Sequence, residues 1–187
     1  AHNLDYEYPF AATIPTYYAL LAQRYLHEYN LDPSVLAEVA VATRKHAARN
    51  PNATMRELIT VDDVLNSPII SSPLHRLDCS LVSDGAAAYV VSRKGTSRDP
   101  RREIGFLGIG QAQSTYHMGH LARGHGDHDL VHTVIDVAGR QAFGQAGLTP
   151  EQIDVAGIYD SFTITVLVQL EDLGFCGRGE AGDYIRA

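Results

Sequence analysis

The sequence predicts an α/β fold, and two patterns carry this prediction. Residues 104–172 alternate between apolar runs of strand length and longer segments with helical spacing. This strand–helix–strand–helix order is typical of neighbouring parallel strands joined by a right-handed crossover. In addition, the short apolar run over 155–158 stops at Tyr159-Asp160, where helical spacing begins. Ligands collect at such junctions in α/β folds, because free backbone N–H groups and the helix dipole favour negative charge there.

The first part of the chain is predicted to be helical. Apolar residues recur at helical spacing over 15–30 and again over 33–49. The second helix should end before Pro51, because the residue that precedes a proline is disfavoured in a helix. Thr60 is the expected N-cap of a short helix over 61–65.

Later residues carry the strand signals. The apolar runs over 86–91, 104–111 and 155–159 are predicted strands, and the polar run over 93–102 is the best linker candidate. A helix is predicted over 130–146 from its apolar face. We therefore expect the last two of these strands to be parallel neighbours, with that helix crossing between them.

Composition indicates a soluble globular protein. The 187 residues are 45% hydrophobic and 20% charged, which is ordinary for a globular chain. A net charge of −7 gives no general support for nucleic-acid binding, and no apolar run is long enough to cross a bilayer. The two cysteines lie far apart and no signal-peptide pattern opens the chain, so we expect a cytoplasmic protein.

Two motifs carry a family resemblance. One is Tyr159-Asp160-Ser161-Phe162 with the later Leu170-Glu171-Asp172-Leu173-Gly174-Phe175, and the other is Leu77-Asp78-Cys79-Ser80-Leu81-Val82-Ser83-Asp84-Gly85-Ala86-Ala87-Ala88. Together they resemble the sterol-carrier-protein-2 branch of the thiolase-like superfamily, along nearly the whole chain. The resemblance implies part of a thiolase-like α/β fold: a helical loop segment over 1–76, the end of a first half over 77–97, and the start of a second half over 98–187. The family's nucleophilic cysteine and its last two motifs match nothing here, so the chain resembles a central fragment.

The resemblance implies an enzyme that cleaves a carbon–carbon bond of an acyl-CoA. Tyr159 stands where thiolase relatives have a histidine that helps to hold the thioester oxygen, and a phenol can donate a hydrogen bond to that oxygen. Some members of the branch are retro-aldolases that shorten steroid side chains with active-site tyrosines, and Tyr159 favours that activity on a 3-hydroxyacyl-CoA. The alternatives are a thiolytic acetyl-CoA acyltransferase and a non-catalytic protein that binds acyl groups or sterols. On position alone, Tyr159 could also be a core residue at a strand end.

Further expectations about ligands and partners follow from the resemblance. Ser161 and Phe162 are expected beside the substrate, as are Tyr116, His117 and His120 of a histidine-rich loop. Metal binding by that loop, or simple solvation of it, remains an alternative. We expect a coenzyme A thioester as substrate with no further cofactor and no metal. The family implies a homodimer, and its aldolase members work with a small partner that carries an OB-fold and a zinc ribbon.

Several polar residues have structural explanations from sequence alone. Asp160 or Ser161 is expected to cap the helix that follows, and Asp78 to bind local backbone N–H groups. Cys79 and Cys176 lie in apolar surroundings without a local histidine or lysine, so we expect unreactive thiols. The basic end of the second helix either complements the helix dipole or contacts a coenzyme A phosphate; its residues are Arg44, Lys45, His46 and Arg49.

Overall fold

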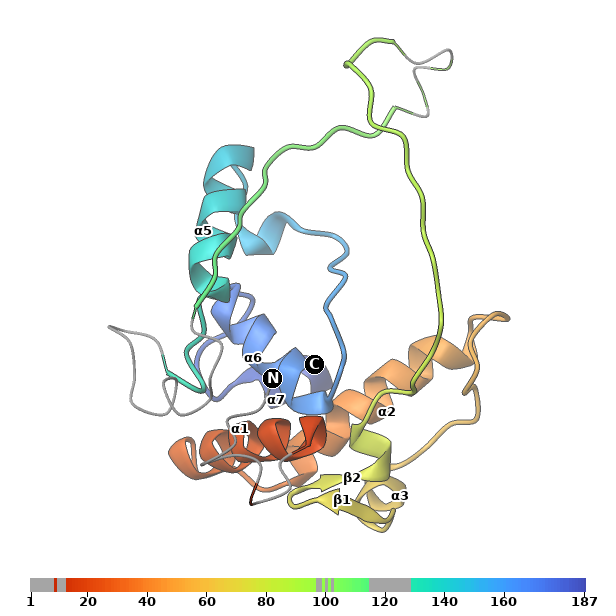
Figure 1. Ribbon diagram of the computed structural model, residues 1–187, viewed down its shortest axis with the longest axis vertical. Coiled ribbons are helices and arrows are strands. Elements are labelled where there is room, and N and C mark those ends of the chain that lie inside the picture. Colours follow the sequence, from red (N-terminus) through yellow and green to blue (C-terminus); the bar gives the residue numbers. More distant parts are fainter. Residues whose placement is uncertain (1–8, 10–12, 97–98, 100, 102, 115–128) are drawn as a thin grey trace.

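Helices make up most of the regular structure in the computed structural model, which describes residues 9, 13–96, 99, 101, 103–114 and 129–187 (Figure 1). The α-helices are α1 (Ile14–Glu28), α2 (Ser34–Ala48), α3 (Val61–Leu65), α5 (Ile135–Ala146), α6 (Thr163–Asp172) and α7 (Ala181–Arg186). Also present are the 3₁₀ helices η2 (Arg76–Asp78) and η4 (Pro150–Gln152) and an antiparallel hairpin of β1 (Ile69–Ser71) and β2 (Leu74–His75). None of the described helices is both long and apolar enough to cross a membrane.

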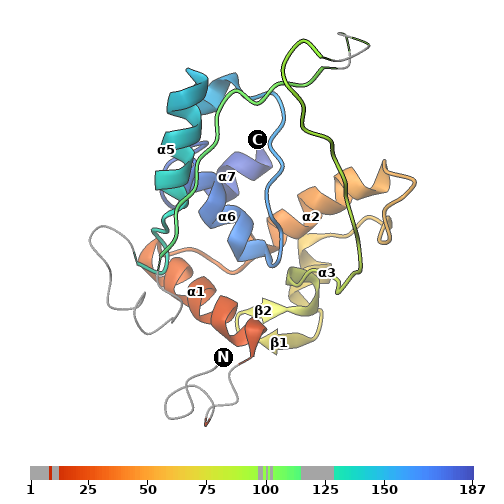
Figure 2. The same ribbon diagram turned by 45° about the horizontal axis from the view of Figure 1, so that its top comes forward.

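Helix α6 is a central element of the hydrophobic core. It packs against α1, α2, α5 and α7, as the two views of the molecule show (Figures 1 and 2). Ile164 and Leu167 of α6 are buried together with Leu36 and Val39 of α2. This packing holds the first turn of α6, and the chain that enters it, against the helices of the first half.

The short-range helix signals are confirmed. Helix α1 begins after Thr13 and carries a proline in its first turn, and α2 ends before Pro51. Thr60 caps α3 as predicted, because its hydroxyl oxygen accepts a hydrogen bond from the N–H of Asp63 at 3.1 Å. In return, the carboxylate of Asp63 accepts a hydrogen bond from the N–H of Thr60 at 2.8 Å. Each of these helix starts, ends and caps depends on residues within about one turn, which is why the sequence predicts them.

The three predicted strands are not formed within the described residues. Segments 86–91, 104–111 and 155–159 have no ladder partner there, and most of their apolar side chains are exposed: Val90 to 95%, Ile104 to 93% and Val155 to 88%. The expected parallel pair is therefore absent from the described chain. An apolar pattern marks a segment suited to a sheet, but a strand also requires a neighbour for its N–H and C=O groups.

Segment 104–111 instead lies along α5 (Figures 1 and 2). Its glycines allow the close approach, since a Cβ added to Gly108 or Gly110 would lie 2.0 or 1.7 Å from a backbone oxygen of α5. The N–H groups of Ile109 and Gln111 donate to side-chain oxygens of α5 at 3.1 Å in each case. Gly108 and Gly110 thus serve the packing of this segment on α5.

Helix α5 begins at Ile135, later than the predicted residue 130. The carboxylate of Asp129 accepts hydrogen bonds from the N–H groups of Val131 and His132, at 2.8 and 2.9 Å. This side chain closes a turn ahead of the helix, so the helical ladder begins only after it.

The predicted division of the chain at residues 77 and 98 stays a prediction.

Candidate active site

The structure brings the two family motifs together. Cys79 and Phe162 form an isolated antiparallel bridge, and the N–H of Ser80 donates to the carbonyl oxygen of Ser161 at 3.1 Å. A side-chain contact reinforces the junction, because the hydroxyl of Thr163 donates to Asp78 Oδ1 at 2.9 Å. The first turn of α6 is therefore fixed to the segment that follows η2.

A cavity of about 330 Å³ lies beside this junction. Its walls come from α2, from the loop over 53–59, from the 77–83 segment and from the start of the α6 motif. Arg44, Cys79 and Asp160 contribute polar atoms to a lining that also includes alanine, methionine and leucine side chains. A hollow of this size, with both apolar and polar groups in its lining, is suited to part of a small-molecule ligand.

Asp160 lines the cavity and is half-buried. Burial raises the pKa of its carboxyl group. The prediction that Asp160 or Ser161 caps α6 is wrong: the N-cap residue is Phe162, and no side chain caps the helix. The reason is geometric, since Ser161 and Asp160 lie one and two residues before the N-cap position. Within the described residues, no hydrogen bond or ion pair engages the Asp160 carboxylate.

Asp78 lines the same cavity, but its carboxylate has hydrogen-bond donors. It is only 3% exposed, and burial raises the pKa of its carboxyl group. Its Oδ2 accepts the N–H of His75 at 2.8 Å, and its Oδ1 accepts the hydroxyl of Thr163. The prediction that Asp78 binds local backbone is confirmed, and the bond to Thr163 adds a contact between distant parts of the chain. Asp78 is thus a structural carboxylate.

Tyr159 is 72% exposed and does not line the cavity. Its backbone carbonyl is held from α6, where the side-chain amide of Gln169 donates to it at 2.6 Å. The phenol stands in solvent, so the structure does not make Tyr159 a core residue. Its predicted catalytic role stays a prediction.

The other predicted site residues are either packed or outside the described residues. Ser161 is buried with its hydroxyl 3.4 Å from that of Thr165, and the ring of Phe162 stacks on Tyr18 with centroids 4.4 Å apart. Packing accounts for both side chains, and their contact with substrate stays a prediction. Tyr116, His117 and His120 lie outside the described residues.

The two thiols are not activated. Cys79 and Cys176 are half-buried, and burial raises the pKa of each, for Cys176 to about 11. A thiolate is the reactive form of cysteine, so a raised pKa opposes nucleophilic attack. This supports the expectation that both cysteines are unreactive.

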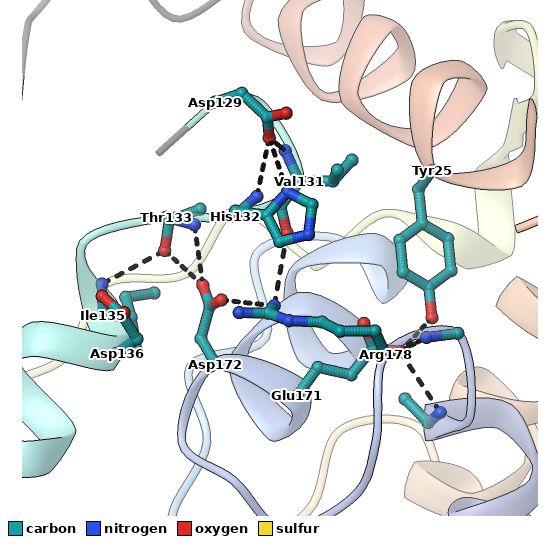
Figure 3. Close-up of polar contacts among 12 residues, drawn as sticks. Tyr25, Asp129, Val131, His132, Thr133, Ile135, Asp136, Glu171, Asp172 and Arg178 are labelled. Atoms are coloured by element: carbon teal, nitrogen blue, oxygen red, sulfur yellow. Dashed lines mark hydrogen bonds and ion pairs between the residues drawn. The ribbon is translucent and has the colours of Figure 1, made fainter. Parts of the chain in front are cut away.

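The far end of α6 is anchored by a buried polar cluster (Figure 3). Glu171 Oε1 accepts the N–H groups of Gly179 and Ala181, at 3.0 and 3.3 Å, and the hydroxyl of Tyr25. Burial raises the pKa of the Glu171 carboxyl group, and burial together with Glu171 raises the pKa of the Tyr25 phenol. The cluster therefore ties α6 to α1 and to the start of α7.

The neighbouring Asp172 holds the turn that precedes α5. Its Oδ2 accepts the N–H and the hydroxyl of Thr133 at 3.1 and 2.5 Å, and its Oδ1 pairs with the guanidinium of Arg178 at 2.5 Å (Figure 3). With both ends fixed, α6 is a rigid support for the motif at its start.

One group of side chains has the composition of a metal site. Glu28, Asp129 and His132 offer ligand atoms that lie within 4.8 Å of one another. Local contacts engage all three residues, because Arg24 pairs with Glu28 at 2.8 Å and the carboxylate of Asp129 lies 3.1 Å from Nδ1 of the His132 ring. The group is therefore explained without an ion.

Comparisons with known proteins agree with the geometry. Residues 110–187 match the thiolase C-terminal domain-like family. The chain is 33% identical to a solved structure named "Ltp2-ChsH2(DUF35) aldolase", with a TM-score of 0.71 over 97% of this chain and 48% of that one. This chain has a thiolase-like fold. The family resemblance drawn from the two motifs is thereby confirmed.

Two curated proteins are similar to this thiolase-like chain over almost all of its length. It is 40% identical to the "Steroid side-chain-cleaving aldolase" of Thermomonospora curvata, over 95% of this chain and 46% of that protein. It is 39% identical to the "17-hydroxy-3-oxo-4-pregnene-20-carboxyl-CoA lyase" of Mycobacterium tuberculosis, over 97% of this chain and 47% of that protein. The chain thus spans about half the length of these relatives.

Sequence analysis assigned Asp160 to a helix cap in preference to a catalytic base, and so did not count it among the site residues. A carboxylate beside a motif tyrosine, just before a predicted helix, is the signal that could have found it. The cap interpretation prevailed because Asp at such a position usually binds the first free N–H groups of the helix.

Proposed function

We propose that this protein is an acyl-CoA carbon–carbon bond-cleaving enzyme that acts as a retro-aldolase on a 3-hydroxyacyl-CoA in the degradation of steroid or lipid side chains. One observation carries the proposal: Asp160 of the Tyr159-Asp160-Ser161-Phe162 motif lines a cavity, in a chain 40% identical to a steroid side-chain-cleaving aldolase. The names of the lyase and aldolase relatives support the same reaction class.

The reaction has three chemical requirements. A base must take the proton of the 3-hydroxyl group, a donor must stabilise the thioester enolate that forms, and an acid must protonate the enolate carbon. The exposed phenol of Tyr159 is suited to the second task. With an unperturbed pKa of about 10, a tyrosine is protonated at neutral pH and can donate to an oxygen on which charge develops.

The coenzyme A moiety would lie over the basic end of α2. Arg44 lines the cavity, and Lys45 and His46 belong to the last turn of the same helix. Phosphates favour such clusters of positive charge. The cavity then receives the acyl end of the thioester, and the reaction needs no further cofactor.

We also propose that the enzyme is a cytoplasmic homodimer with a second, OB-fold and zinc-ribbon protein. The name of the similar structure joins two components, Ltp2 and ChsH2(DUF35), which supports a second protein. A thiolytic acetyl-CoA acyltransferase remains the second candidate, since residues 110–187 match the thiolase C-terminal domain-like family.

The substitution Tyr159→Phe in the intact enzyme tests the proposal. It removes one donor and keeps the ring, so ketone release from a 3-hydroxyacyl-CoA should fall by about 100-fold or more. The melting temperature should barely change, because the phenol is exposed. Thiolysis of a 3-ketoacyl-CoA is measured beside it.

Thiolysis without ketone release would favour the acyltransferase. Full aldolase turnover in the Tyr159→Phe variant would show that Tyr159 has no catalytic role.

A further inference from the structure

Asp160 is a carboxylate without a structural task in the described chain. It lines the cavity at the junction of the two motifs and is half-buried, yet it caps no helix and joins no ion pair there. Asp78, in the same cavity, is held by His75 and Thr163. A carboxylate that loses solvent without gaining a partner lowers stability, which is typical of a group kept for function.

We propose that Asp160 is the catalytic base that takes the hydroxyl proton of the substrate and returns it to carbon, a role that rests on the proposed retro-aldol function. Tyr159 is its neighbour in sequence and supplies the enolate donor in that function. The two tasks therefore fall on adjacent residues at the entrance to α6.

The proton transfers balance without any further reactant. The Asp160 carboxylate takes the proton of the 3-hydroxyl group, and the bond between C2 and C3 of the acyl chain breaks. Its electron pair forms the thioester enolate, and the ketone leaves. Asp160, now a carboxylic acid, delivers the proton to C2, which yields the shortened acyl-CoA and restores the carboxylate.

The surroundings of Asp160 suit this exchange. The other ionisable groups that line the cavity are Arg44 on α2, Asp78 on η2 and Cys79 after it. Burial, and none of these groups, is the cause of the raised pKa of Asp160. A base whose pKa is raised toward the working pH both accepts and returns a proton more evenly. Since the carboxylate form is needed, turnover should fall as pH falls through this raised pKa.

The test compares wild-type, Asp160→Asn and Asp160→Glu forms of the full-length enzyme, with Asp78→Asn as the matched control. Ketone release from a 3-hydroxyacyl-CoA is one assay. Exchange of the C2 hydrogens of propionyl-CoA with D₂O is the second, because it follows enolate formation alone. Asp160→Asn should lower both rates by about 100-fold or more and abolish the acid limb of the pH profile. Asp160→Glu should restore part of both rates, and the acid limb of its pH profile should lie at a different pH.

Stability separates the two carboxylates. The melting temperature should hold or rise in Asp160→Asn, whereas Asp78→Asn should lower it, because Asp78 has two hydrogen-bond donors.

Three results would overturn the assignment. Exchange at full rate in Asp160→Asn would do so, as would a wild-type profile without an acid limb. If the wild-type enzyme neither exchanges the C2 hydrogens nor releases ketone, both the catalytic role of Asp160 and the proposed function are wrong. Exchange of the C2 hydrogens without ketone release would contradict only the retro-aldolase function. The role of Asp160 would then be tested by the exchange rates of its variants.

Discussion

The two oxygens of the Glu171 carboxyl group have different surroundings. Oε1 accepts hydrogen bonds from Tyr25, Gly179 and Ala181, whereas Oε2 is buried without a partner in the described residues. Burial is the largest influence, and it raises the pKa of the group despite those three donors. The ionised form is therefore disfavoured in the folded protein relative to the unfolded chain.

This imbalance predicts a pH dependence of stability. Because the folded pKa of Glu171 lies above the unfolded value of about 4.3, its stabilising contribution is complete below that pH and is lost as pH rises through the folded pKa. Glu171→Gln is uncharged, so the free energy of unfolding of wild type relative to this variant should decrease as pH rises. Urea unfolding at several pH values between about 4 and 8 measures it.

The exposed Glu57→Gln serves as the control for loss of one carboxylate. An advantage of wild type over Glu171→Gln that grows with pH would contradict the prediction.

At the scale of the element, the packing of segment 104–111 on α5 depends on two glycines. A Cβ on Gly110 would meet the backbone oxygen of Ala138 at 1.7 Å, whereas a Cβ on Gly105 would meet nothing within 4 Å. Gly110→Ala must displace the segment, because a backbone atom cannot rotate away as a side chain can. Gly105 offers the same chemical change in open space.

We therefore expect Gly110→Ala to lower the free energy of unfolding by about 1–3 kcal/mol, as overpacking does. Gly105→Ala should be neutral or stabilise by about 0.4–1 kcal/mol, because it restricts the unfolded chain. Denaturant unfolding of both variants measures the difference. Equal effects of the two substitutions would show that the segment does not rest on α5.

At the scale of the whole molecule, the helical core contrasts with a long exposed arc. Residues 80–96 leave the helical body, and residues 103–114 return beside α5 in both views (Figures 1 and 2). Residues 81–91 are exposed throughout. Leu167 in α6, by comparison, is fully buried. The free energy of local opening should therefore differ greatly between these parts.

Hydrogen exchange of this 187-residue chain tests the contrast. The amides of 86–91 should exchange at nearly the rate of an unfolded peptide, since they have no ladder partner in the described chain. The amides of 166–170 should exchange far more slowly, because α6 opens only with the core. Protection over 86–91 comparable to that of α6 would mean that the segment is paired in solution.

The sequence by itself determined the features that neighbouring residues decide. Thr60 caps α3 through a residue three positions away, and Pro51 limits α2 from the next turn. The two motifs, one around Tyr159 and one around Cys79, likewise sufficed together for the thiolase-like assignment, because family resemblance is a property of the residues themselves.

Only the tertiary structure decided what depends on distant partners. Asp78 meets Thr163 across 85 positions and Tyr25 meets Glu171 across 146, and no local pattern encodes such pairs. The apolar pattern of 155–159 marks a strand, but whether a ladder forms depends on which backbone lies beside it. Asp160 reads as a cap in sequence, yet the start of α6 at Thr163 leaves its carboxylate facing a cavity instead. Local physics fixes caps and helix ends, whereas burial and pairing are set by the packing of the whole chain.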